Sequence, residues 1–148
     1  MKLAVLALDY DGTITRADVL DPSVRAAIAS ARTNGIVTLL VTGRILGELL
    51  RVAGQLHFVD GVVAENGAVL HFPDSGHTSV LAPPTPEAFI DALRRRGIGH
   101  TAGLCLVDAN ASDAPRLLEV IHELELPLVL IAARPVASTA VPGSQRRH

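Results

Sequence analysis

Residues 3–13 read LAVLALDYDGT, an apolar run that stops abruptly at two aspartates. The run from Leu3 to Leu8 is too short for a helix and carries no polar residue, which is typical of a strand buried on both faces. Asp9 and Asp11 then place two carboxylates at the corner between this strand and a loop. In isolation Asp11 and Gly12 could simply form a tight turn. Whether they form a turn only or part of a functional site must therefore be decided from the neighbouring segments.

The next segments alternate between helical and strand-like patterns. Pro22 follows the capping residue Asp21 and opens a helix that Asn34–Gly35 closes. A β-branched run at 36–41 predicts a strand, a helical stretch continues through Leu50, and residues 61–64 predict a third strand. This β-α-β-α-β order predicts an α/β fold with a parallel sheet and right-handed crossovers.

Ligands of open parallel sheets bind beyond the carboxyl ends of the strands. The predicted sheet brings the polar residues that follow its strands to that one edge: Asp9, Asp11, Thr42, Glu65 and Asn66. The aspartate pair therefore lies beside a second strand that ends in Thr-Gly. This context favours a functional site over a simple turn.

The pattern changes after residue 67. Residues 68–72 and 78–81 predict a hairpin that leads into a proline-rich linker at 82–86. We interpret the rest as a small α+β module with an α-β-α-β-β order, at residues 87–96, 104–107, 114–124, 128–132 and 136–141. The expected organisation is a core at 1–82, the module at 83–141 and a tail at 142–148 without structural signal, expected to be disordered.

Composition narrows the class of partner. The 148 residues are 49% hydrophobic and carry a formal net charge of only −2. This net charge gives no overall electrostatic attraction to nucleic acid, so a small-molecule partner is expected instead. The apolar run at 36–41 is far shorter than the roughly 20 residues of a membrane span. Lys2 leads into a strand-like sequence rather than into a signal peptide. We therefore expect a cytoplasmic protein without a membrane partner. The basic run Arg94–Arg96 closes a predicted helix, where cations suit the helix dipole on a solvated face.

Cysteine and histidine give little reason to expect redox or zinc chemistry. Cys105 is the single cysteine, so an intrachain disulfide is excluded and a buried structural thiol is expected. The six histidines show no HxH or HxxxH spacing, which argues against a zinc site built from them.

Three segments carry a resemblance to a known family. Asp9-Tyr-Asp-Gly-Thr13 resembles the first motif of the haloacid dehalogenase (HAD) superfamily, and Leu40-Val-Thr-Gly-Arg44 resembles its second. Ala64-Glu-Asn-Gly-Ala68 is similar to the segment that leads into the cap of members whose cap follows the third core strand, the Cof-like and mannosyl-phosphoglycerate phosphatase-like subgroup. The resemblance implies a partial Rossmann-like core followed by a small α+β cap.

The resemblance also implies a chemistry for the aspartate pair. Asp9 would be the nucleophile that forms an aspartyl-phosphate, and Asp11 would protonate the leaving group and then activate water. Mg²⁺ would neutralise the repulsion between Asp9 and the phosphate, with the Asp9 carboxylate and the Asp11 backbone carbonyl as metal ligands. The implied substrate is a small phosphorylated metabolite, such as a sugar phosphate or a phosphorylated acid.

The second and third segments supply candidate binding residues. The Thr42 hydroxyl and the Gly43 N–H at a helix start would bind the transferred phosphate, although Thr42 could also be a helix N-cap and both roles can coexist. Arg44 could reach substrate or pair with a surface carboxylate, and both alternatives stay open. Asn66 is a candidate substrate contact, but Asn66–Gly67 is equally a common hairpin dipeptide.

The sequence also departs from the family pattern. Neither the phosphate-binding lysine of a third motif nor the acidic pair of a fourth is found, and only Arg147 falls where that lysine would lie. Asp108 and Asp113 lie in the cap-like segment. Asp113 is more simply explained as an acidic residue at the start of a helix, where it suits the helix dipole. We therefore expect a C-terminally truncated family member whose first strand is an open edge, inviting a homodimer, a complementing chain or aggregation.

Three functional hypotheses follow. The first is an Mg²⁺-dependent phosphomonoester hydrolase of the HAD type. The second is a truncated, catalytically impaired remnant that binds a phosphate ligand or a partner chain. The third is a phospho-accepting signalling module, but its acidic residues would be adjacent rather than spaced as DxD, and Asp60 precedes the third strand and is a poor acceptor.

Overall fold

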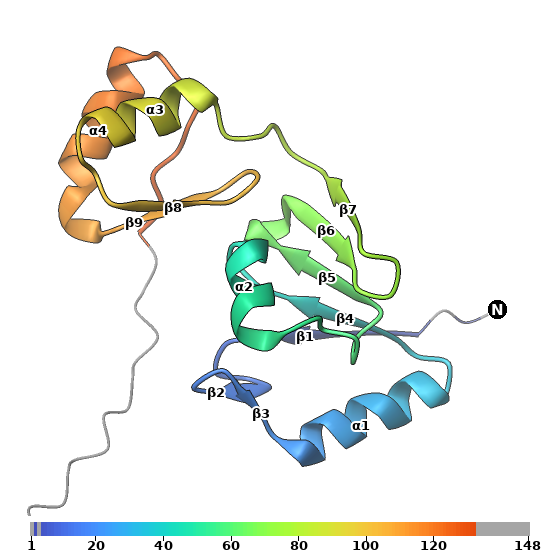
Figure 1. Ribbon diagram of the computed structural model, residues 1–148. Helices are drawn as coiled ribbons and strands as arrows, with labels where there is room; N and C mark the ends of the chain where they lie inside the picture. Colours follow the sequence, from blue (N-terminus) through green and yellow to red (C-terminus); the bar gives the residue numbers. More distant parts are fainter. Residues whose placement is uncertain (1, 3, 133–148) are drawn as a thin grey trace, which may run out of the picture.

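Three parallel strands form the first part of the sheet in this computed structural model, which describes residues 2 and 4–132. Strand β1 (Val5–Asp9) pairs in parallel with β4 (Val37–Val41), and β4 pairs in parallel with β5 (Gly61–Ala64). Helices α1 (Pro22–Thr33) and α2 (Leu46–Ala53) connect them (Figure 1). The predicted α/β class and the β-α-β-α-β order are confirmed.

Helix α1 begins and ends as its flanking residues predict. The Asp21 carboxylate accepts a hydrogen bond from the Ser23 N–H at 2.7 Å, and Pro22 occupies the first turn, where its missing N–H is not needed. At the other end the Asn34 N–H bonds the last turn, and Gly35 continues in the left-handed region at φ 76°. The chain can therefore turn directly into β4.

The hairpin of β6 (Val69–Phe72) and β7 (His77–Val80) extends the same sheet with antiparallel pairing. The strand order is β1-β4-β5-β6-β7, so β1 is an edge strand in the part of the chain that the structure describes, as the sequence predicted. A second, small hairpin of β2 (Thr15–Arg16) and β3 (Val19–Leu20) lies between β1 and α1 and was not predicted.

The two faces of the sheet are covered unequally. Leu40 and Val62 are fully buried neighbours in register, and they belong to the same hydrophobic cluster as Ile28 of α1 and Leu49 of α2. Right-handed crossovers that advance in one direction along a sheet place both helices on one face. On the opposite face, large apolar side chains remain exposed: Val5 at 49%, Val41 at 39% and Phe72 at 38%.

A second hydrophobic cluster forms around helices α3 (Glu87–Arg95) and α4 (Ala114–Glu123), with Phe89, Leu93 and Val120 at its centre. The hairpin of β8 (His100–Ala102) and β9 (Val107–Ala109) lies between the two helices in the chain (Figure 1). Among residues 87–132 the order is α-β-β-α, whereas α-β-α-β was expected over these residues.

Two expected strands of this region are wrong. Residues 104–106 form the turn of the β8–β9 hairpin, because the Leu104 and Cys105 N–H groups bond a side chain, Glu65, instead of a partner strand. Residues 128–132 form no strand, and Val129 is 83% exposed. The expected strand at 136–141, the tail at 142–148 and Arg147 lie outside the described residues. Within residues 4–132 no helix has the length and apolar character needed to cross a bilayer.

Candidate phosphoryl-transfer site

Asp9 is the last residue of β1, and its carboxylate is exposed at the carboxyl end of the sheet. The Thr13 hydroxyl donates to Asp9 Oδ2 at 3.2 Å. The loop between them is fixed by a left-handed Gly12 (φ 71°) and by the buried Thr15 hydroxyl, which donates to the Tyr10 carbonyl at 2.9 Å. The loop therefore orients one Asp9 oxygen and leaves the carboxylate open to solvent.

Asp11 is held by Arg44. The guanidinium donates from Nε and Nη2 to Asp11 Oδ1 at 3.0 and 2.6 Å, and Nη2 also lies 2.9 Å from Asp18 Oδ1. Hydrogen bonding to Asp11 raises the pKa of Arg44, while partial burial of the guanidinium acts in the opposite direction. The guanidinium carbon lies 5.4 Å from the centre of the Tyr10 ring. Of the two alternatives for Arg44, the structure shows a carboxylate partner, and that partner is the candidate acid-base residue itself.

Thr42 follows Val41, the residue that pairs with Asp9, so the two candidate residues end neighbouring strands. Its side chain is buried, and its Oγ1 accepts from the Arg44 N–H at 3.1 Å, which leaves the hydroxyl hydrogen for another acceptor. Helix α2 begins only at Leu46, with Ile45 as its N-cap. Thr42 is therefore not a helix N-cap, and the expectation that Gly43 lies at the helix start is wrong. The intervening loop at 42–45 carries the candidate binding groups.

Glu65 and Asn66 contact this loop from the end of β5. Both adopt the left-handed region, at φ 52° and 57°, which is uncommon for residues other than glycine. The Glu65 N–H donates to the Arg44 carbonyl at 3.0 Å. A Cβ on Gly43 would lie only 2.7 Å from Asn66 Oδ1. The structure thus brings Asn66, Gly43, Arg44 and Asp11 into one contiguous group.

Three residues of this site were missed as functional candidates. Thr13 belongs to the first motif but was given no role of its own, and Asp18 lies in the unpredicted β2–β3 turn at φ 61°. Glu65 was placed at the ligand edge, but its carboxylate was given no role. Asp108 and Asp113 remain outside the site, and the Asp113 carboxylate, at the N-cap of α4, lies 3.2 Å from Arg116 in the first turn of that helix.

The contacts of Asp60 indicate a structural role. Its Oδ2 accepts from the Thr38 N–H at 2.8 Å, and its Oδ1 lies 2.9 Å from Arg32 Nη2. The hydrogen bond from the Thr38 backbone is the main reason that the pKa of Asp60 lies below its usual value. Asp60 precedes β5, at the end of the sheet opposite the aspartate pair, so its contacts favour a role in joining α1 to β4.

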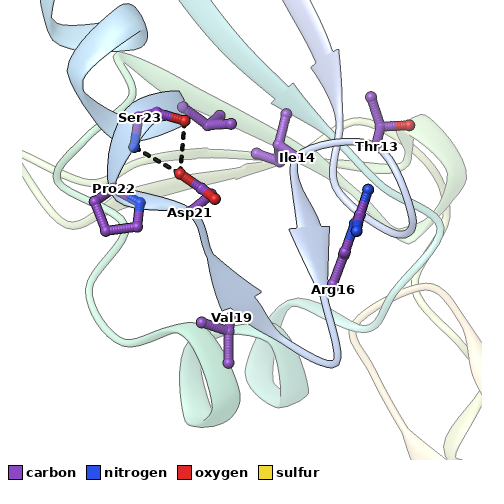
Figure 2. Close-up of a pocket in the computed structure, with 8 residues that line it drawn as sticks. Thr13, Ile14, Arg16, Val19, Asp21, Pro22 and Ser23 are labelled. Atoms are coloured by element: carbon purple, nitrogen blue, oxygen red, sulfur yellow. Dashed lines mark hydrogen bonds between the residues drawn. The ribbon is translucent and has the colours of Figure 1, made fainter. Parts of the chain in front are cut away.

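A shallow pocket of about 530 Å³ adjoins the site between the β2–β3 hairpin and the start of α1. Figure 2 shows how its side chains are arranged around the Asp21 cap. Thr13, which bonds Asp9, lies on its wall, whereas the two candidate aspartates do not. The lining residues are Thr13, Ile14, Arg16, Val19, Asp21, Pro22, Ser23 and Val24. The pocket therefore lies beside Asp9, the candidate nucleophile, rather than around it.

The oxygen atoms at Asp9 and Asp11 are of the kind that Mg²⁺ prefers. Mg²⁺ commonly binds one or two protein carboxylates, keeps several waters and takes further ligands from substrate phosphate. The exposed Asp9 carboxylate and the Asp11 backbone carbonyl suit such a sparse ligand set, since Arg44 occupies only the Asp11 side chain. Within the described residues, no three His, Cys, Asp or Glu side chains gather as a metal site.

Sequence comparison identifies the family. The sequence profile of haloacid dehalogenase-like hydrolases matches residues 6–107, which include the aspartate pair and the loop at 42–45. The chain belongs to this family. This HAD-like chain is 37% identical over 73 residues to a phosphoglycolate phosphatase of Methanothermobacter thermautotrophicus, a match covering 49% of the chain and 33% of that relative. It is 35% identical over 94 residues to a phosphoglycolate phosphatase of Halorubrum lacusprofundi, covering 62% and 39%.

Solved structures show the same fold at low sequence identity. Protein 0175 of Thermoplasma acidophilum aligns over 84% of the HAD-like chain and 59% of its own length, with a TM-score of 0.58 and 16% identity. A haloacid dehalogenase-like hydrolase from B. subtilis aligns over 66% and 35%, with a TM-score of 0.52 and 22% identity. The chain thus spans only 33% and 39% of the two curated relatives.

Proposed function

We propose that this chain is a phosphatase that hydrolyses the phosphomonoester of a small metabolite. The supporting observation is the exposed Asp9 carboxylate at the end of β1, oriented by Thr13 and paired in register with Val41, the residue before Thr42. A carboxylate fixed in this way can act as a nucleophile toward phosphorus. The two phosphoglycolate phosphatases among the relatives support a phosphorylated acid as substrate.

In the first step an Asp9 oxygen bonds to phosphorus while the bond from phosphorus to the leaving oxygen breaks. Asp11 gives its proton to that oxygen, so the product leaves as an alcohol. In the second step Asp11 takes a proton from water, whose oxygen attacks phosphorus as the aspartyl-phosphate bond breaks. Inorganic phosphate leaves and Asp9 is restored.

The other residues bind and orient. The Thr42 hydroxyl hydrogen is free for a phosphate oxygen because its oxygen already accepts from the Arg44 N–H. Arg44 donates two hydrogen bonds to the ionised Asp11 carboxylate, which orients this side chain in the form that takes a proton from water in the second step. Asp9 and the Asp11 carbonyl would hold Mg²⁺, which supplies charge neutralisation between the carboxylate and the phosphate.

The test is hydrolysis of an aryl phosphate with Mg²⁺ by the purified chain. We predict that Asp9→Asn lowers turnover by roughly three orders of magnitude or more, because the amide has nearly the same shape but is a far weaker nucleophile. Asp108→Asn is the matched control, since Asp108 is an exposed carboxylate of β9, and its turnover should equal that of the wild type.

Each outcome bears on a separate part of the proposal. Turnover that survives Asp9→Asn excludes Asp9 as the nucleophile. Activity that persists after EDTA treatment contradicts the role of Mg²⁺. Absence of turnover in the wild type at every Mg²⁺ concentration favours the second candidate.

That second candidate is a catalytically impaired family member that binds a phosphate ligand or a partner chain, either a second copy or a complementing polypeptide. The specific observation is the edge position of β1 within the described residues, together with the exposed apolar face that includes Val5 and Val41. Unpaired strand edges and large apolar patches are common sites of association.

A further inference from the structure

Glu65 is a buried carboxylate for which the phosphoryl-transfer steps have no use. It is only 2% exposed, yet no salt bridge joins it to a cation among the described residues. Its Oε1 accepts from the Leu104 N–H at 3.1 Å and from the Leu46 N–H at 3.4 Å, and its Oε2 accepts from the Cys105 N–H at 2.7 Å. Three backbone donors therefore take the place of water around this charge.

These donors come from two parts of the molecule. Leu46 is the first residue of α2 and follows the loop at 42–45 in the candidate site. Leu104 and Cys105 lie in the turn between β8 and β9, in the region that contains α3 and α4. We call this region, residues 87–123, the cap. Glu65 itself directly follows β5, so one carboxylate joins the sheet, the candidate binding loop and the cap.

The close approach of the cap turn depends on a residue without a side chain. A Cβ on Gly103 would lie 2.5 Å from Glu65 Oε1 and 2.7 Å from its carboxyl carbon, far inside van der Waals contact. The Thr85 N–H donates to the Leu104 carbonyl at 3.0 Å, and the Cys105 thiol donates to the Ala82 carbonyl at 3.5 Å. The linker from the sheet to the cap is therefore fixed to the same turn.

The local backbone and the buried charge indicate that this contact is specific. A buried carboxylate is costly unless hydrogen bonds replace its hydration, and charge-assisted bonds to N–H groups are among the stronger ones. Left-handed conformations at two consecutive non-glycine residues, Glu65 and Asn66, also persist only where surrounding contacts hold them. Separation of the cap turn would remove two of the three donors.

We propose that Glu65 is a positioning residue that holds the cap in place and couples its position to the loop at 42–45. The proposal rests on the phosphatase function proposed above. The coupling has a short physical path, because the Glu65 N–H bonds the Arg44 carbonyl and its side chain bonds the first N–H of α2. Closure of a loop or domain over an active site commonly controls substrate access and product release in enzymes.

The first test measures hydrogen exchange of individual backbone amides by NMR, which needs no enzymatic activity. Gly103→Ala, a change in the cap, should accelerate exchange of the Leu104 and Cys105 amides and also of the Leu46 amide in α2. The matched control is Gly99→Ala, because a Cβ at Gly99 would meet no atom within 4 Å. Exchange at Leu46 that is identical in the two variants would overturn the coupling.

The second test separates positioning from chemistry. Glu65→Gln keeps one carbonyl acceptor but turns an amide NH₂ toward backbone donors, so the cap turn should detach more often. We expect KM for the aryl phosphate to rise about tenfold while kcat changes little, as for the loss of one hydrogen bond to a charged group. Unchanged KM together with faster exchange at Leu104 would overturn the positioning role.

The two proposals fail in different ways. If the wild type has no turnover, the phosphatase proposal fails, and the affinity for inorganic phosphate replaces KM as the readout for Glu65→Gln. A weaker affinity in that variant supports the positioning role, and an unchanged affinity overturns it. If Glu65→Gln does not fold, Gly103→Ala carries both measurements, since it leaves the carboxylate intact.

Discussion

Arg44 organises the charges of the candidate site at the scale of single residues. Its guanidinium contacts Asp11 and Asp18, while its backbone N–H and carbonyl bond Thr42 and Glu65. An arginine fork fixes a carboxylate more firmly than the single ammonium of lysine can. Within the proposed mechanism, this contact sets the direction in which Asp11 faces the leaving group.

Gly43 gives a prediction about packing at the same scale. Gly43→Ala should lower the free energy of unfolding by about 1–3 kcal/mol, the usual cost of overpacking, because the new methyl group would overlap Asn66 Oδ1. Urea unfolding measures the change. Adding Asn66→Gly should restore part of the loss, since glycine removes the side chain and tolerates φ 57°.

Gly47→Ala is the control for this prediction. Gly47 lies in α2 and a Cβ there would meet nothing within 4 Å, so alanine should be neutral or slightly stabilising. A double variant with Asn66→Gly that is no more stable than Gly43→Ala would contradict the steric explanation.

At the scale of elements, the sequence predicts best where the periodicity and the end signals agree. Helix α1 has a capping aspartate, a proline in its first turn and an Asn-Gly stop, and its observed bounds match. Short apolar runs that stop at polar residues predict the three parallel strands. Because parallel strands end at a shared edge, these runs alone also predict that Asp9, Asp11 and Thr42 lie at one end of the sheet.

The missed elements lack such signals or depend on distant contacts. The β2–β3 hairpin turns through Ala17 and Asp18 at positive φ, without the glycine that usually marks such a turn. The apolar residues at 104–107 resemble a strand, but the carboxylate of Glu65, about 40 residues earlier in the chain, accepts from the N–H groups of Leu104 and Cys105. No local pattern can reveal that partner, and the role of Glu65 was missed for the same reason.

Strand β6 yields a prediction about pH. His71 is buried beside Thr78, with its Nδ1 2.8 Å from the hydroxyl, and burial lowers its pKa below the usual value of about 6.5. The His71 imidazole therefore binds a proton more readily in the unfolded chain than in the folded chain. Stability should be full above the unfolded pKa and should fall as the pH decreases below it.

The measurement is the urea midpoint at several pH values between 5 and 8. His71→Gln should flatten the decrease below about pH 6.5, whereas His77→Gln, at an exposed position of β7, should retain it. An identical pH dependence in the wild type and His71→Gln would show that another group is responsible.

At the scale of the whole molecule, helices cover one face of the sheet and leave apolar residues exposed on the other. Strands of parallel sheets are normally buried on both faces. Here the exposed fractions of Val5, Val41 and Phe72, on the uncovered face, lie between 38% and 49%. The chain spans only 33% and 39% of the length of the two curated relatives.

This exposed face should cause the 148-residue chain to self-associate as its concentration rises. Val5→Lys places a charge on the edge strand and on the exposed face, and we predict that it shifts the equilibrium toward monomer in sedimentation velocity experiments. Val19→Lys is the control, because Val19 is 68% exposed on the separate β2–β3 hairpin. Equal association of both variants, or a wild type that is monomeric at all concentrations, would contradict the prediction.

The order of strands in the main sheet has a consequence for how the protein is made. The strands of this sheet lie side by side in the order in which they occur along the chain, from β1 through β4, β5, β6 and β7. Every strand emerging from the ribosome can therefore add to a surface that has already been synthesised. The parallel pairings of β1 with β4 and of β4 with β5 close longer loops than the antiparallel pairings of β5, β6 and β7, so the antiparallel strands should pair fastest once they leave the ribosome.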